Sequence, residues 1–177
     1  MKPHENPSEL LYSAAHVCAA AGISYDTLKN WTAKSPAVIV MDHPLEERPG
    51  RGGVVRYSFQ RALHIALTAE LGRLGLPLKR ASAIALNFTD MGDVDLTVGP
   101  LREVGKLYTQ GSTFLLHFAG TEVGVVVNTL DDSTLCAAAS MCGLTWGHAF
   151  VVLPVDHIFN HVSRVLTAHV SPGAWGL

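Results

Sequence analysis

Residues 21–31 read AGISYDTLKNW, and this short stretch indicates how the first half of the chain folds. Gly22 has the backbone freedom that ends a helix, and Ser24 carries a side-chain oxygen that can cap the start of the next one. In that next helix, Leu28 and Trp31 are three positions apart and therefore share one face. The stretch predicts a tight turn followed by a short helix that reaches Trp31.

Another short helix is predicted directly before this turn. Ser13 can cap its start, and apolar residues follow at near-helical spacing as far as Ala21. Two short helices joined by a glycine-containing turn form a helix-turn-helix, a motif of many DNA-binding domains. Residues 1–10, which contain Pro3 and Pro7, are interpreted as a flexible arm.

A β-hairpin is predicted after the helix pair. Residues 37–41 and 54–59 are rich in β-prone side chains. The polar stretch between them, residues 42–53, is rich in Pro and Gly and suits a long hairpin loop, or wing.

Two further helices are predicted to complete the first domain. Apolar residues recur at roughly helical period over residues 59–75, and Gly75-Leu76-Pro77 interrupts the pattern before a helix at residues 78–88. We therefore predict a winged helix-turn-helix domain over residues 11–88.

The second half of the chain has the pattern of a small α+β domain. Residues 89–100 are rich in Asp and Gly and lack a clear period, so we interpret them as a linker. A domain of order ββαβα is predicted over residues 101–170, with a tail at residues 171–177. Its predicted elements are strands at 112–118 and 122–128, a helix at 133–141, a strand at 150–153 and a closing helix at 155–168.

The composition predicts a globular, cytoplasmic protein that does not associate with membranes. With 48% hydrophobic and 16% charged residues, the chain can bury one large core or two small ones. No apolar run approaches the ~20 residues that span a bilayer, and the N-terminal residues lack the layout of a secretion signal. Three cysteines without paired spacing predict no disulfide framework.

Positive charge gathers in the first half of the chain. Residues 1–90 contain ten Lys or Arg against eight Asp or Glu, whereas the remaining residues contain three against seven. Between Arg48 and Arg80 there are seven basic residues and one acidic residue, Glu70. A compact basic face matters more for nucleic-acid binding than the net charge of −2. We expect such a face in the first half.

Several segments together resemble the DNA-binding domain of the MerR family of bacterial transcription regulators. Their order and spacing are similar to that family's helix-turn-helix, wing and following helix pair, over about residues 11–88. The family's long dimerisation helix is not matched, because residues 90–100 interrupt helical character. The matching segments are YSAA at 12–15, AGISYDTLKNW at 21–31, RYS at 56–58 and LGRLGLPL at 71–78.

The predicted DNA contacts lie on the second helix and on the wing. A recognition helix enters the major groove with its N-terminal residues toward the base edges. Lys29 and Asn30 can donate to bases or phosphates, and Tyr25 can reach a phosphate oxygen. The resemblance places the wing arginines beside the phosphates, where they release counterions. The predicted DNA-binding residues are Ser24, Tyr25, Asp26, Lys29, Asn30, Arg48, Arg51, Arg56 and Tyr57.

These features predict a sequence-specific transcriptional regulator of MerR-like type that binds double-stranded DNA. A homodimer is expected through residues 101–170, with residues 123–127 and the final helix as candidate surfaces. One alternative is an excisionase-like or other architectural DNA-binding factor. Another is an interaction module whose residues 101–170 bind a protein partner.

The histidines and cysteines of the second half form no compact metal-ligand pattern. His157 and His161 share a helical face, and Cys136 and Cys142 could add thiolates, but no Cys-x-x-Cys or His-Glu-x-x-His motif is present. Neither a nucleophile motif nor a phosphate-binding glycine loop organises the acidic residues. We expect no metal site, no cofactor and no catalytic activity.

Overall fold

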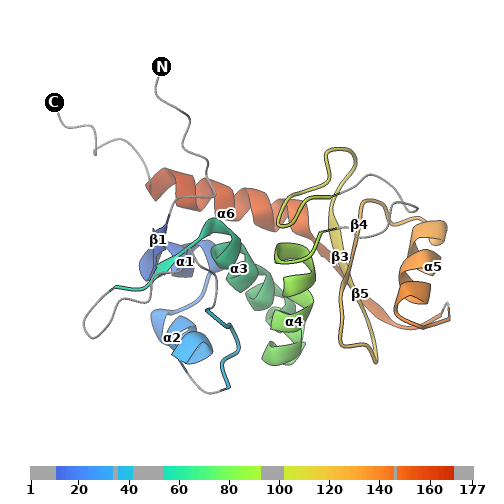
Figure 1. Ribbon diagram of the computed structural model, residues 1–177, viewed down its shortest axis with the longest axis horizontal. Helices are drawn as coiled ribbons and strands as arrows, with labels where there is room; N and C mark the ends of the chain where they lie inside the picture. The colour runs from blue at the N-terminus through green and yellow to red at the C-terminus, as the bar shows by residue number, and fades with distance from the viewer. Residues whose placement is uncertain (1–10, 34–35, 42–53, 93–101, 146, 170–177) are drawn as a thin grey trace.

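The computed structural model describes residues 11–33, 36–41, 54–92, 102–145 and 147–169. Within them, six helices and two small antiparallel sheets form an α+β fold, as predicted (Figure 1). The helices are α1 (Ala14–Ala21), α2 (Tyr25–Ala33), α3 (Phe59–Arg73), α4 (Leu78–Thr89), α5 (Asp132–Met141) and α6 (Val155–His169). The strands are β1 (Tyr12–Ser13), β2 (Arg56–Tyr57), β3 (Phe114–Phe118), β4 (Val125–Val127) and β5 (Phe150–Pro154).

The two short helices form on either side of Gly22, as the sequence predicts. The Ser13 side chain accepts the backbone N–H of His16 and caps α1. Gly22 ends α1 in the left-handed conformation, with φ 61°, a region that L side chains rarely adopt. On the inner side of α2, Leu28 and Trp31 are both buried.

The prediction of a strand at residues 37–41 is wrong. The backbone N–H groups of Val38 and Ile39 both donate to the carbonyl oxygen of Trp31, at 2.9 and 3.0 Å, so the chain turns back over the end of α2. Ile39 is thereby fully buried. These hydrogen bonds compete with strand pairing for the same backbone groups.

The predicted strand at residues 54–59 is reduced to β2, and its partner is β1 rather than residues 37–41. In this two-stranded sheet Tyr12 lies opposite Tyr57. The pairing ties the start of α1 to the start of α3, which follows β2 directly. The loop predicted as the wing, residues 42–53, lies outside the described residues.

Helix α3 lies at the centre of the molecule. Residues 61–69 are buried on every face, because α1, α4 and α6 all pack against this helix (Figure 1). Ser58 caps its start by accepting the N–H of Arg61 at 3.1 Å. The turn at Gly75-Leu76-Pro77 then leads into α4, as the sequence predicts.

The second half contains a three-stranded antiparallel sheet of order β4-β3-β5. In its register Phe114 lies opposite both Val127 and Pro154. Helix α5 covers one face of the sheet, and the elements follow in the predicted order, ββαβα. The core under α5 consists of Leu116, Phe118, Val125, Val127, Leu135, Ala138 and Ala139.

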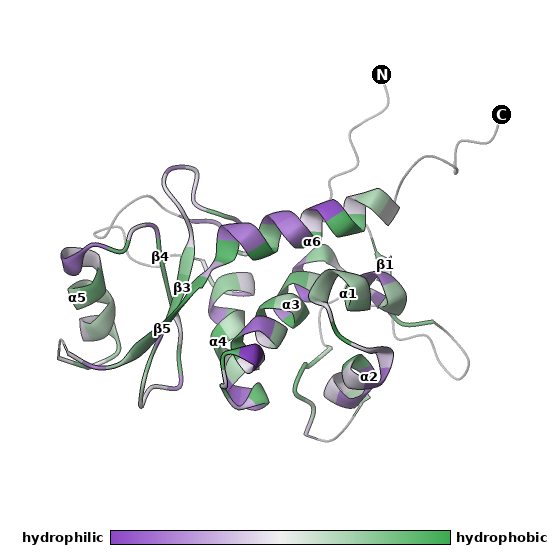
Figure 2. Cartoon of the chain, turned by 180° about the vertical axis from the view of Figure 1, so that it is seen from behind, coloured by the Kyte–Doolittle hydropathy of each residue, from purple (hydrophilic) through white to green (hydrophobic). Residues whose placement is uncertain are grey.

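The last helix joins the two halves instead of closing a separate second domain. It lies along α1 and α3 in both views (Figures 1 and 2). Val162 and Leu166 are fully buried in the same core as the residues of α1 and α3. The predicted linker, residues 89–100, falls largely outside the described residues, and the core is continuous across it.

Candidate nucleic-acid interface

Helix α2 presents a polar, exposed face to solvent. Tyr25 is 62% exposed, and Asp26, Lys29 and Asn30 are exposed as well. Leu28, on the opposite side of the helix, is only 1% exposed. The 3.6-residue period of the helix therefore separates the predicted contact residues from the core side chains.

Ser24 plays a structural part at the start of this helix. Its hydroxyl oxygen accepts the backbone N–H of Thr27 at 3.1 Å and lies 2.9 Å from the Thr27 hydroxyl. Both groups are exposed, so Ser24 belongs to the predicted surface while its side chain caps the helix.

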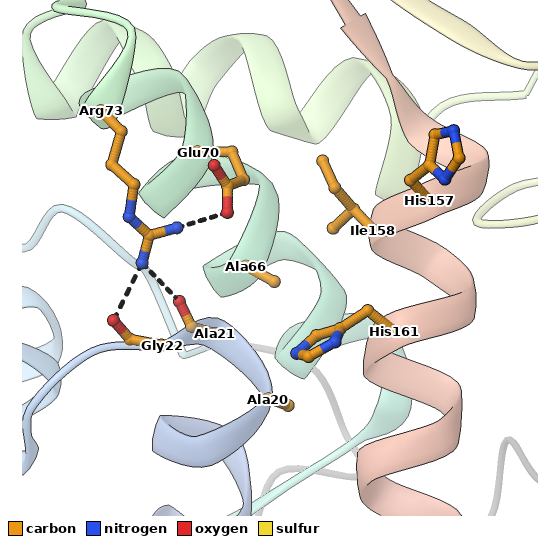
Figure 3. Close-up of a pocket in the computed structure, with 9 residues that line it drawn as sticks. All are labelled: Ala20, Ala21, Gly22, Ala66, Glu70, Arg73, His157, Ile158 and His161. Atoms are coloured by element: carbon orange, nitrogen blue, oxygen red, sulfur yellow. Dashed lines mark hydrogen bonds and ion pairs between the residues drawn. The ribbon is translucent and has the colours of Figure 1, made fainter.

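The turn before α2 is held by a side chain from α3. The Nη2 atom of Arg73 donates to the carbonyl oxygens of Ala21 and Gly22, each at 2.9 Å, and Nη1 pairs with Glu70 (Figure 3). Carbonyl oxygens at the end of a helix have no partner within the helix, so a cation there stabilises the end. Arg73 thus fixes the orientation of the turn from which α2 starts.

The two predicted DNA-binding residues of β2 face opposite sides of the strand. Arg56 is exposed, whereas Tyr57 is only 4% exposed and packs in the core. Side chains alternate across a strand, so one of these neighbours faces solvent and the other faces inward. Tyr57 therefore offers little surface to a ligand. Arg48 and Arg51 lie outside the described residues.

Fewer basic side chains of the first half are available to a ligand than the sequence indicates. Arg61 is 5% exposed, and its Nη1 lies 2.8 Å from Nδ1 of His64. Arg80 forms an ion pair with Glu122 at 2.6 Å. Arg73 pairs with Glu70 in the same way, and both of these ion pairs lie at the surface. Because their charges already have partners within the protein, Arg61, Arg73 and Arg80 are poorer candidates for phosphate contacts than unpaired cations.

Three exposed cations remain in the described part of the first half, namely Lys29, Arg56 and Lys79. None of them has an ion-pair partner among the described residues. Lys29 lies on the same face of α2 as the other predicted contacts, which makes it the cation best placed to act with them.

A small open cleft of about 250 Å³ lies where α1, α3 and α6 meet (Figure 3). Small apolar residues line much of it, and the Arg73–Glu70 pair is part of the lining as well. Within the described residues, no group of three or more His, Cys, Asp or Glu side chains is placed to hold a metal ion. The cleft is lined by Ala20, Ala21, Gly22, Ala66, Glu70, Arg73, His157, Ile158 and His161.

Sequence reasoning missed the two roles that arginines of α3 play in the fold. Arg73 is 51 positions from Gly22, and no local pattern links a basic residue to a helix end so far away. Arg61 joins a buried polar network in which His64 Nε2 lies 3.1 Å from the Ser82 hydroxyl, and that hydroxyl donates to Val38. The polar residues within an otherwise apolar α3 are the only signal of this network.

Comparison with known proteins adds no support to the MerR-like resemblance, which therefore stays a proposal. No family model matches the chain, and no curated protein matches it. Among the helices described, none combines the length and apolar character needed to cross a bilayer.

Proposed function

We propose that this protein is a sequence-specific transcriptional regulator that binds double-stranded DNA as a homodimer. The observation that carries the proposal is the exposed polar face of α2, which is mounted on a helix pair with a fixed turn. A helix of this kind can enter the major groove with its first residues toward the base edges. The MerR-like resemblance of residues 11–88 supports a winged helix-turn-helix arrangement.

Each residue of this face has chemistry that suits DNA. In our proposal Asn30 donates to and accepts from a base edge, and Asp26 accepts from an exocyclic amino group such as that of cytosine. The hydroxyl of Tyr25 and the ammonium of Lys29 contact phosphates, which fixes the register of the helix on the duplex.

Arg56 extends the proposed surface beyond α2. It is exposed on β2, directly after the predicted wing, and a guanidinium there neutralises phosphate. In the proposal Arg48 and Arg51 add further phosphate contacts from the wing. Because Arg61, Arg73 and Arg80 are engaged elsewhere, each protomer makes few phosphate contacts and depends on pairing for its affinity.

Genomic DNA selection tests this proposal. Fragments retained by the purified full chain at moderate salt are sequenced, and the selection is repeated with the double variant Lys29→Ala/Arg56→Ala. We expect one enriched motif with two-fold symmetry, which the variant fails to enrich. The matched control, Lys106→Ala/Arg164→Ala, removes the same charge from sites remote from α2 and should retain the motif.

Other outcomes of the selection contradict the proposal. Cooperative coverage of adjacent repeats, without a discrete palindrome, would indicate an architectural factor. No enrichment above background would rule out sequence-specific binding and leave a protein partner as the alternative.

A further inference from the structure

The cleft between α1, α3 and α6 exists because the residues that face it from α1 and α3 are mostly small. Ala20 and Ala66 are buried behind it, and neither reaches far enough to meet α6. Further along α6, Val162 and Leu166 fill the space against the same core and are fully buried. The volume of about 250 Å³ is therefore space that the described side chains leave unfilled (Figure 3).

The apolar part of the lining can hold the hydrocarbon part of a small molecule. Ile158 of α6 is half-buried and points toward α3, where Ala66 lies (Figure 3). Sites for small molecules occur between packed helices and are mostly apolar, with a few polar groups that fix the orientation of the ligand. Drug-sized ligands occupy roughly 300–1,000 Å³, so the occupant of this cleft is smaller.

The polar group best placed to orient such a molecule is the ring of His161. Nη2 of Arg164 lies 3.5 Å from Nδ1 of this ring. A guanidinium has only donors, so Nδ1 accepts, and in its neutral form the ring then carries its proton on Nε2. The ring is exposed and reaches toward α1 (Figure 3). Its Nε2–H has no partner among the described residues, so it can donate to a ligand.

The charges around the cleft favour an anion over a cation. Glu70, the acidic residue of the lining, is already paired with Arg73. Asp156 of α6 accepts the backbone N–H of the residue before β3 at 2.6 Å. Arg164 has no acidic partner among the described residues, and its positive charge lies beside His161. That charge attracts an anion and opposes a metal ion.

We propose that this cleft binds a small organic carboxylate whose apolar body is one ring or a short chain. The carboxylate accepts the Nε2–H of His161 and lies in the positive field of Arg164. The hydrocarbon part packs against Ala66 and Ile158, away from water. This binding site goes beyond the proposed function and does not depend on it.

The cleft adjoins the contact that orients α2. Arg73 lines it with the same guanidinium that donates to the carbonyl oxygens of Ala21 and Gly22 (Figure 3). An anion bound nearby attracts this guanidinium. The backbone amide of Gly22 should therefore respond to binding, together with the residues of the lining.

Amide NMR of the isotope-labelled full chain tests the inference. Benzoate and hexanoate are titrated separately, each with its amide, benzamide or hexanamide, as the uncharged counterpart. We expect saturable shifts confined to residues around the cleft, with a dissociation constant on the order of 1 mM for ligands of about nine non-hydrogen atoms. The amides should bind at least about 10-fold more weakly, because hydrogen bonds to a charged group are the stronger ones.

A single substitution on α6 tests the role of the donor. His161→Ala removes an exposed ring, so the fold should persist. Its affinity for the tighter of the two carboxylates should fall at least about 10-fold. The matched control His148→Ala removes an exposed ring that does not line the cleft, and it should bind like the native chain.

Three results would overturn the inference. The first is the absence of saturable shifts around the cleft with both carboxylates. The second is an amide that binds as tightly as its carboxylate, and the third is a His161→Ala variant that binds as tightly as the native chain. Because the titrations contain no DNA, none of these results bears on the proposed function, which the genomic selection tests separately.

Discussion

The Nη2 atom of Arg73 lies 2.9 Å from the carbonyl oxygen of Gly22, although the two residues are 51 positions apart in the sequence. This hydrogen bond joins the last turn of α3 to the turn between α1 and α2. Because α2 carries the proposed DNA-binding face, the orientation of that face depends on a residue that lies outside it.

Replacing Arg73 with leucine is expected to lower the free energy of unfolding by about 1–2 kcal/mol, because carbonyl oxygens at the end of α1 are left without their charged donor. Affinity for the selected DNA should fall as well, since the turn before α2 becomes less fixed. Urea denaturation and fluorescence anisotropy measure the two effects. Lys79→Ala, a change at an exposed cation of α4, serves as the control. Unchanged stability in Arg73→Leu would contradict the role we assign to this arginine.

Gly124, the residue before β4, lies close against α4 and β3. A Cβ atom at this position would lie 2.8 Å from Cγ2 of Ile84 and 2.9 Å from Cδ1 of Leu115. Gly124→Ala should therefore destabilise the protein by about 1–3 kcal/mol through overpacking. Thermal unfolding measures the destabilisation, and Val123→Ala at the exposed neighbouring position should change stability by less than about 0.5 kcal/mol. Equal stabilities would show that the sheet does not pack against α4 at Gly124.

Arg102 is 4% exposed and closes the end of α4. Its guanidinium donates to the carbonyl oxygens of Phe88 at 3.0 Å and Asn87 at 3.3 Å, and it lies 4.8 Å from the centre of the Phe88 ring. Arg102→Met should cost about 2–4 kcal/mol, because buried carbonyl groups are left without a donor. Arg102→Lys keeps the charge without the planar fork and should cost less. Chemical denaturation compares the variants, and a neutral effect of Arg102→Met would refute this role.

Asp131 caps α5 through its carboxylate. Hydrogen bonds from Ser133, from Thr129 and from the backbone of Thr134 hold the pKa of this carboxyl well below its usual range. A carboxyl whose pKa is lowered by folding stabilises the protein above the pKa of the unfolded chain, about 4. That stabilisation disappears as the pH falls toward the folded value.

Asp131→Asn tests this dependence, because asparagine keeps the shape of the side chain but does not ionise. The variant should melt at a lower temperature than the native chain at pH 7, and the difference should narrow as the pH falls below about 4. Asp132→Asn, at the adjacent exposed position, is the control. A difference that stays constant from about pH 7 to about pH 2 would contradict the carboxylate's role.

Local structure in this chain could be predicted closely from the sequence. Caps, turns and apolar periods act over a few residues, so Ser13, Gly22 and Ser24 lie at the helix ends where we predicted them. The turn after α3 and the order of elements in the second half follow from the same short-range signals. Separation of the polar and apolar faces of α2 was predictable for that reason too.

Long-range partners could not be predicted in this way. An apolar stripe shows that α6 buries one face, but not that the face covers α1 and α3 rather than the small sheet. Residues 37–41 have β-prone side chains, yet Val38 and Ile39 bond to Trp31 at the end of α2. An arginine that adds to a basic stretch of the sequence can be hydrogen-bonded or ion-paired to other groups of the folded protein, and its charge is then less available to DNA.

Binding affinity as a function of salt tests whether this protein binds DNA sequence-specifically through α2 and Arg56. The full chain is titrated onto a duplex carrying the selected motif and onto a scrambled duplex, by fluorescence anisotropy. The native chain should prefer the motif at least about 1000-fold, within the usual range for specific binding. In Lys29→Ala/Arg56→Ala that preference should fall, and the slope of log K against log salt should become shallower by about 0.9 for each phosphate that the variant no longer neutralises. Equal affinity of the native chain for both duplexes, or an affinity that the double variant leaves unchanged, would contradict sequence-specific DNA binding through these residues.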